Sequence, residues 1–307
     1  MILRNASLTL AIGFAGLTPA ISALQTSAAA TSNATRAATT AAPVQLPPVS
    51  VEQLAQRNAE ARGGKAAWER VRAMSMSGKL DAGRTRIDGG RTGMATSKLG
   101  LAQAKALARK SVAITGAVDS GRVIQLPFQL DMQRPAKTRL EIPFQGDTAV
   151  QVYDGVQGWK LRPYLGRRDV EPYSAEELKL AASQQQLDGA LINYSTKGTQ
   201  VALAGAELVD GHPAYKLQLT LKGGEIRHLW IDAKTSLDLK IDSKPRLWDG
   251  KLRQVSTYFR DYKPVQGLLI AHRLETVVEG VPGSESIYVE KVALNPTLTD
   301  QRFARPQ

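Results

Sequence analysis

The chain of 307 residues contains no cysteine and only three histidines. Without cysteine there can be no disulfide, thiol nucleophile, Cys-ligated zinc, iron–sulfur cluster or lipid-acylated cysteine. The three histidines, His212, His228 and His272, lie in separate segments and do not form the His-Glu-x-x-His pattern of a helical zinc site. The sequence therefore predicts neither a metal site nor a cofactor.

Catalytic motifs are also lacking. We find no phosphate-binding Walker A loop, no dinucleotide fingerprint after a strand and no Gly-x-Ser-x-Gly nucleophile elbow. The carboxylate pair Glu176 and Glu177 falls in the first turn of an expected helix, where negative charge complements the helix dipole. We therefore expect a protein that is not an enzyme.

The charge is strongly one-sided, with 40 Lys and Arg against 28 Asp and Glu, a formal net charge of +12. Basic residues are interspersed with acidic ones, and the few aromatics (6%) do not alternate with them as base-stacking platforms would. This pattern argues against nucleic-acid binding. A basic exported protein would instead be attracted to anionic lipid headgroups or other envelope polyanions.

No apolar run reaches the roughly 20 residues that a membrane-spanning helix needs. The mostly apolar stretch from Leu8 to Leu17 follows the basic start of Met1 and Arg4 and precedes small residues around Ala23. We interpret residues 1–23 as a signal peptide of a soluble periplasmic protein, with an uncleaved anchor as the alternative. Residues 24–50 are rich in Ala, Thr, Ser and Pro, which predicts a disordered tether.

The folded domain is expected to cover residues 51–307. A helix should begin at Val51, because Ser50 and Gln53 fit a capping box, and should break at Gly63-Gly64. A second capping box predicts a helix from Ser174 to about Gln186. Residues 82–122 carry eight basic side chains against two acidic ones and have no regular pattern. We expect these residues to form a flexible basic insertion that faces a membrane or a partner. The alternative is a solvated loop without a specific role.

The remaining sequence consists of short segments with β-like composition separated by turn residues. The expected strands are Met74–Leu80, Val123–Gln133, Thr138–Phe144, Thr148–Asp154, Gly158–Arg162, Thr199–Leu203, Ala206–Val209, Ala214–Leu221, Glu225–Asp232, Asp238–Asp242, Leu252–Phe259, Leu269–Val278 and Ser286–Leu294. Short links such as Gly223-Gly224 and Asp249-Gly250 favour antiparallel neighbours, because parallel strands need long crossovers. The prediction is a mainly β fold built on one large, curved antiparallel sheet.

Alternation gives this sheet one apolar face and one wet face. Tyr215, Leu217 and Leu219 should share a face, and Leu237, Leu239 and Ile241 should oppose Asp238, Lys240 and Asp242. Two or three helices cannot cover so much apolar surface, so the rest must form a sandwich, close into a barrel or line a ligand cavity. The candidate cavity-lining residues are Trp159, Leu217, Leu219, Trp230, Leu237, Leu239 and Val255. For each tryptophan, core packing is the alternative role.

A family resemblance rests on several short motifs. They are Val152-Tyr153-Asp154-Gly155 with Gly158-Trp159, Leu187-Asp188-Gly189 with Asn193-Tyr194, Gly211 with Tyr215 and Ile231-Asp232, Asp261-Tyr262 with Gly267-Leu268 and His272, and Leu294-Asn295-Pro296 with Phe303. Together they resemble the bacterial LolA-like outer-membrane lipoprotein-sorting proteins. The resemblance implies an unclosed β-barrel whose concave apolar face is covered by helices.

The same resemblance implies a function, a periplasmic carrier that binds the acyl chains of a lipid or lipoprotein during outer-membrane sorting. Such a carrier needs a dry cavity but no covalent step. Two alternatives stay open: an envelope lipid sensor or protein-interaction module on the same fold, and a lipid hydrolase. The hydrolase is the weaker of the two, because no nucleophile and base are paired in the sequence.

Overall fold

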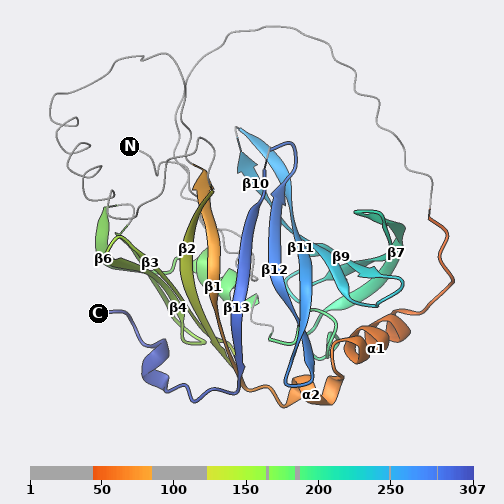
Figure 1. Ribbon diagram of the computed structural model, residues 1–307, viewed down its shortest axis with the longest axis horizontal. Helices are drawn as coiled ribbons and strands as arrows, with labels where there is room; N and C mark the ends of the chain where they lie inside the picture. The colour runs from red at the N-terminus through yellow and green to blue at the C-terminus, as the bar shows by residue number, and fades with distance from the viewer. Residues whose placement is uncertain (1–43, 85–122, 164–165, 184–186, 249, 282) are drawn as a thin grey trace, which may run out of the picture.

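A single antiparallel sheet of thirteen strands dominates the computed structural model (Figure 1), which describes residues 44–84, 123–163, 166–183, 187–248, 250–281 and 283–307. The strands are β1 (Ala73–Arg84), β2 (Val123–Gln133), β3 (Lys137–Phe144), β4 (Asp147–Tyr153), β5 (Gly158–Arg162), β6 (Arg167–Pro172), β7 (Gln200–Val209), β8 (His212–Thr220), β9 (Ile226–Asp232), β10 (Asp238–Trp248), β11 (Lys251–Val265), β12 (Leu268–Val278) and β13 (Glu285–Leu294). The predicted mainly β antiparallel architecture is confirmed.

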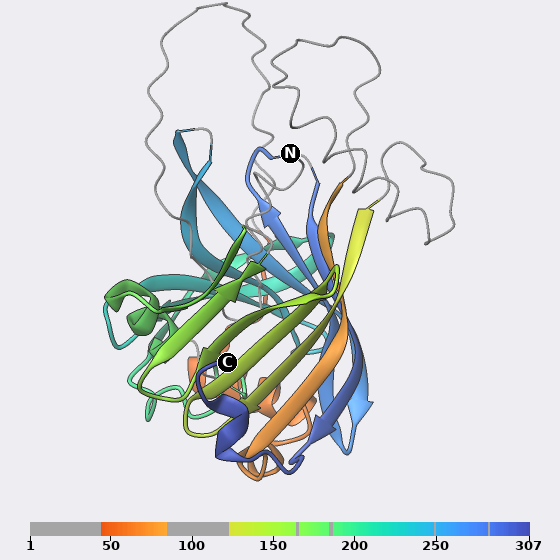
Figure 2. The same ribbon diagram turned by 90° about the vertical axis from the view of Figure 1, so that its left-hand side faces the viewer.

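The strand order shows why the sheet stays open. β1 lies in the middle, between β2 and β13, and the chain runs as one meander from β1 out to β6 and as another from β7 back to β13. β6 and β7 are therefore the two edges, and in the described chain they do not pair with each other. Figure 2 shows the sheet curling around an interior without closing, as expected for an unclosed barrel.

Bulges contribute to this curl. An extra residue in one strand increases the local twist and bends the sheet. The register between β1 and β13 shifts between Ser77 and Gly78. A β-carbon at Gly78 would lie 1.9 Å from the carbonyl oxygen of Tyr288, so no larger residue fits where the two backbones approach. Further shifts occur in β7, between Leu203 and Gly205, and in β10, between Asp238 and Lys240.

The helices are few and short. α1 (Val51–Ala61) and α2 (Lys65–Glu69) lie at the end of the sheet where β1 begins (Figure 1), and α4 (Ala175–Ser183) follows β6. Both predicted capping boxes are present: Gln53 N donates to Ser50 Oγ at 3.2 Å, and Ser174 N donates to Glu177 Oε2 at 2.6 Å. A short 3-10 helix, η3 (Asp300–Phe303), lies near the C-terminus.

Three local expectations differ from the structure. β6 escaped prediction because it is an edge strand whose residues Arg167 to Asp169 are exposed and charged, so no apolar alternation marks it. The two strands expected between 199 and 209 form one strand, since Gly205 lies at its bulge. Residues 44–50, expected in the tether, pack on the core through Leu46 and Val49, and Tyr215 Oη donates to the carbonyl of Pro47 at 2.9 Å.

The predicted signal peptide, the rest of the tether and residues 85–122 of the basic insertion lie outside the described residues.

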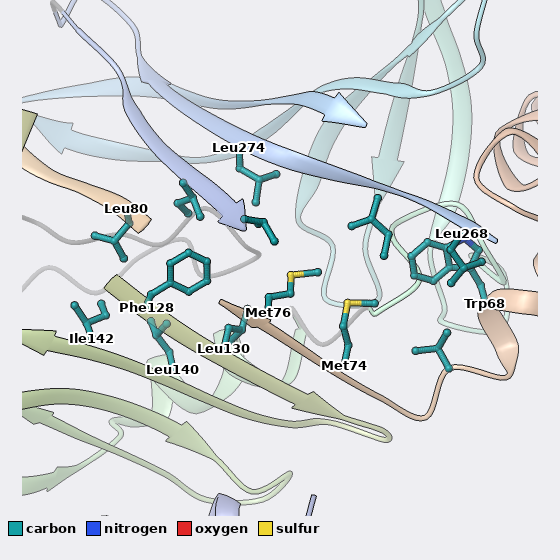
Figure 3. Close-up of a cluster of buried hydrophobic side chains, with 14 of the residues drawn as sticks. Trp68, Met74, Met76, Leu80, Phe128, Leu130, Leu140, Ile142, Leu268 and Leu274 are labelled. Atoms are coloured by element: carbon teal, nitrogen blue, oxygen red, sulfur yellow. The ribbon is translucent and has the colours of Figure 1, made fainter. Parts of the chain in front are cut away.

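The main core fills the inner face of the curled sheet. Met74, Met76 and Leu80 on β1 face Leu268 and Leu274 on β12 across the interior (Figure 3). Phe128, Leu130, Leu140 and Ile142 extend this cluster over β2 and β3, and Trp68 of α2 closes one end. β3, β2, β1, β13 and β12 are consecutive in the sheet order, so this cluster lies on the central strands of the sheet.

The C-terminal segment packs on the outer face of β2, β3 and β4. Phe303, 1% exposed, packs against Val150 and Val152. Arg302 donates to Asp131 Oδ2 at 2.6 Å and to both carboxylate oxygens of Glu141. Burial disfavours the ionised form of Glu141, but hydrogen bonds from Arg302 and Arg139 outweigh it and lower the pKa of this carboxyl.

Arg302→Gln is therefore expected to lower the free energy of unfolding at pH 7 by about 1–2 kcal/mol, the usual cost of losing charge-assisted hydrogen bonds. Because the pKa of Glu141 in the folded protein lies below its ordinary value of 4.5, the contribution is present above that pH and is lost as the pH falls through the folded pKa. Urea unfolding at pH 7 and at pH 3–4 measures this difference. Arg305→Gln, at an exposed position of the same segment, is the control, and a gap between wild type and Arg302→Gln that did not shrink in acid would contradict the assignment.

Candidate functional site

The candidate site is a cavity of about 240 Å³ on the inner face of the sheet. Its walls come from both meanders and from the helical end of the domain. The apolar lining residues include Trp68, Met74, Met76, Met132, Leu219, Leu229, Ile241, Phe259, Ile270 and Leu274. A concave, mainly apolar cavity with a few polar groups is the usual form of a small-molecule site.

The sheet builds the wall from side chains aligned across strands. Leu217 on β8 lies opposite Leu229 on β9, Leu229 lies opposite Ile241 on β10, and Ile241 lies opposite Thr257 on β11. Leu217 and Leu229 are 0% and 1% exposed. The row packs beneath Leu54 of α1 and Leu191, so helix and connecting segment shield this part of the inner face.

Asp188 organises a polar cluster at the helical end of the cavity. Its carboxylate, 2% exposed, accepts from Arg134 Nη2 at 3.1 Å and from Lys197 Nζ at 2.7 Å. Burial lowers the pKa of Lys197, and the hydrogen bond to Asp188 counteracts this in part. Arg62 Nη1 donates to the backbone carbonyl of Asp188 at 2.9 Å. The cluster thereby joins α1, β2 and the segment after α4.

Asp238 pins α1 to the start of β10. Asn58, fully buried, donates to Asp238 Oδ1 at 3.0 Å and to the carbonyl of Ser236 at 2.8 Å. Arg62 Nη1 lies 3.9 Å from Asp238 Oδ2 and its guanidinium stacks over Trp68. Burial raises the pKa of Asp238, while Arg62 and Asn58 favour its ionised form. A shift of α1 would break all of these contacts.

The structure separates the candidate lining residues that alternation suggested. Leu219 lines the cavity. Leu217 lies in the inner-face row, and Val255, 1% exposed, lies opposite the lining residue Ser243. Leu237 is half-buried in the turn between β9 and β10, where its carbonyl accepts from Asp232 N at 2.9 Å.

Trp159, Trp230 and Leu239 lie on the outer face instead. Trp159 packs with Val150, Val152 and the C-terminal Phe303. Trp230 is 2% exposed because Lys216 and Lys240 cover its ring, with Lys240 Nζ 4.0 Å from the ring centroid. For both tryptophans the alternative role of core packing is the one that the structure shows.

The position of Leu239 follows from the bulge in β10. Asp238 pairs with the inner-face residue Ile231, whereas Lys240 pairs with the outer-face residue Trp230. Leu239 is the extra residue between them and packs beside Trp230. Strict alternation therefore fails here: Asp238 and Ile241 both reach the cavity, and Leu239 does not.

Several lining residues were missed in the sequence. Met74 and Met76 carry an alternation signal in the first strand, and Ile270 and Leu274 carry the same signal in β12. Arg227 also lines the cavity and lies on the same strand face as Leu229 and Ile231. A charged residue in line with these apolar residues could have identified it as a lining residue. The cluster around Asp188 joins residues up to 126 positions apart and leaves no local pattern.

The three histidines lie apart from the cavity. Within the described chain, no three His, Asp or Glu residues gather as a metal site would require. His212 and His228 approach Asp232 and Asp242 at 3.3 and 3.5 Å, away from the cavity lining. His272 Nδ1 lies 2.8 Å from the carbonyl oxygen of Ile270.

Among the helices that the structure describes, none combines the length and the hydrophobicity of a membrane span.

No protein-family model matches the chain, and no curated protein sequence matches it. Several solved structures are similar in fold. A LolA superfamily protein from Nitrosomonas europaea is 13% identical, with a TM-score of 0.48, over 84% of this chain and 99% of that one.

Two further structures resemble the chain to the same degree. A DUF1329 family protein from Desulfovibrio piger is 14% identical, with a TM-score of 0.48, over 83% of this chain and 97% of the other. A protein from Vibrio parahaemolyticus described as a putative outer membrane lipoprotein-sorting protein domain is 12% identical, with a TM-score of 0.47, over 82% and 95% of the two chains.

Proposed function

We propose that this protein is a non-enzymatic carrier that binds the acyl chain of a lipid or lipoprotein in the cell envelope. The apolar cavity between the curled sheet and its helices is the observation that carries the proposal. Export by residues 1–23, delivery to the outer membrane and contact of the basic segment 82–122 with anionic lipid belong to the same proposal.

The cavity volume limits how much of a chain can be enclosed. At roughly 30 Å³ for each water-sized group, 240 Å³ holds about eight such groups, the size of a stretch of methylenes. Each buried methylene contributes about 0.8 kcal/mol, so eight of them contribute about 6 kcal/mol before the cost of association. This affinity is moderate, as a carrier that must release its cargo requires.

Affinity is therefore expected to rise about fourfold for each added methylene and to level off once about eight are enclosed. Isothermal titration or displacement of a fluorescent probe, with straight-chain carboxylates from six to fourteen carbons, measures this dependence. Native mass spectrometry of gently purified protein, followed by lipid extraction, identifies the natural cargo. Affinity independent of chain length, in a protein that also purifies empty, would refute the carrier and favour a protein-interaction module.

A further inference from the structure

The charge of the cavity lining is one-sided. Four of the described lining residues are cationic, Arg62, Arg134, Lys137 and Arg227, and Asp238 is the one acidic residue among them. Each of these cations has a carboxylate partner: Asp238 for Arg62, Asp188 for Arg134, Asp300 for Lys137 and Glu225 for Arg227. Binding of an anionic group in the cavity therefore depends on a hydrogen-bond donor that these pairs leave free.

Arg227 differs from the other lining arginines in how it is held. Arg62 is held by Asp188 and Asp238, and Arg134 is held by Asp188 and the carbonyl of Val71. The Arg227 side chain is only 11% exposed, yet its one carboxylate partner is Glu225, which accepts from Nε at 2.7 Å. Its Nη2 is buried and has no hydrogen-bond partner among the described residues. Arg62 Nε is also buried without a partner there, but the Arg62 guanidinium is fixed by Asp188 and Asp238. A buried donor without a partner costs free energy that a ligand can recover.

The position of Arg227 suits the head of an amphiphile. Its cross-strand neighbour on β8 is Leu219, and the next inner-face residue on β9 is Leu229; all three line the cavity. On β10, Ser243 lies two residues beyond Ile241, which pairs with Leu229, and it lines the same cavity as Arg227. A guanidinium and a hydroxyl beside an apolar wall are donors that suit an oxyanion.

We propose that Arg227 binds the anionic headgroup of the amphiphile whose chain fills the cavity, a carboxylate or a phosphate monoester. This inference rests on the proposed carrier function and adds the chemical class of the ligand. The free Nη2 donates to a headgroup oxygen while Glu225 keeps Nε in place. The chain then extends from Leu219 and Leu229 towards Met76 and Leu274.

The test compares three probes with the same ten-carbon chain: decanoate, decyl phosphate and 1-decanol. The wild-type protein should bind at least one of the two anions about tenfold or more tightly than the alcohol, as a buried charge-assisted hydrogen bond implies. Arg227→Gln should remove that preference and change the affinity for 1-decanol less than twofold. Arg227→Lys keeps the charge without the planar fork and should retain part of the preference. Arg168→Gln, at an exposed side chain paired with Asp147, is the matched control.

Each outcome separates this inference from the carrier function. Equal binding of all three probes by the wild type would overturn the headgroup site and leave the carrier intact. A preference for anions that survives in folded Arg227→Gln would overturn the assignment to Arg227. Binding of none of the probes would overturn both proposals. Preference for decanoate alone, or for decyl phosphate alone, supports the site and identifies the source of the oxyanion.

Discussion

Replacing Met76 with tryptophan is expected to weaken acyl-chain binding more than a hundredfold in a protein that still folds. Met76 lines the cavity from the central strand β1 and is 9% exposed. An indole ring there would take the space of the chain, and losing half of the roughly 6 kcal/mol from chain burial amounts to more than two orders of magnitude in affinity. Overpacking costs a well-filled core about 1–3 kcal/mol, and the open cavity space reduces this cost.

The measurement is a titration with decanoate together with thermal unfolding of the same preparation. Val156→Trp adds the same side chain at a turn position that is 77% exposed and should leave both quantities unchanged. If folded Met76→Trp bound decanoate like the wild type, the chain would have to lie outside this cavity.

The second large effect concerns Asp188. Asp188→Ala should lower the free energy of unfolding by about 3–5 kcal/mol, because it leaves Arg134 and Lys197 without their common counter-charge in a largely buried cluster. Since the cluster anchors the segment that packs over the inner-face row, we also expect weaker chain binding in whatever fraction remains folded.

Urea unfolding compares this variant with Asp300→Ala. The Asp300 side chain is 86% exposed and pairs with Lys137 Nζ at 2.5 Å, so its loss should cost less than about 1 kcal/mol. Equal losses for the two variants would show that Asp188 does not hold the helical end of the domain together.

Much of the architecture was predictable because its signals are local. Capping residues such as Ser50 and Ser174 satisfy backbone donors three positions away, so the sequence predicted the starts of α1 and α4. Alternation in Tyr215, Leu217 and Leu219 marked the buried face of β8, and short turns indicated antiparallel pairing. These features depend only on neighbouring residues, and they survive in the folded protein.

The site itself needed the tertiary structure. A bulge moved Leu239 to the outer face and brought Asp238 inside, and the C-terminal segment covered Trp159, so neither strict alternation nor hydrophobicity could identify the cavity wall. Hydrophobicity predicts that a side chain is buried, but it does not predict which of the two faces of the sheet the side chain lies on.

The sequence by itself therefore determined most of the strands, the starts of α1 and α4, the antiparallel order and the surplus of apolar surface, each through patterns within a few residues, whereas the edge strand β6 was missed. Only the tertiary structure decided which face curls inward, which side chains meet across it and where Arg227 keeps a donor without a partner among the described residues. The physical reason is that curvature, bulges and buried charge pairs arise between segments tens to hundreds of residues apart, and such pairings leave no periodic trace along the chain.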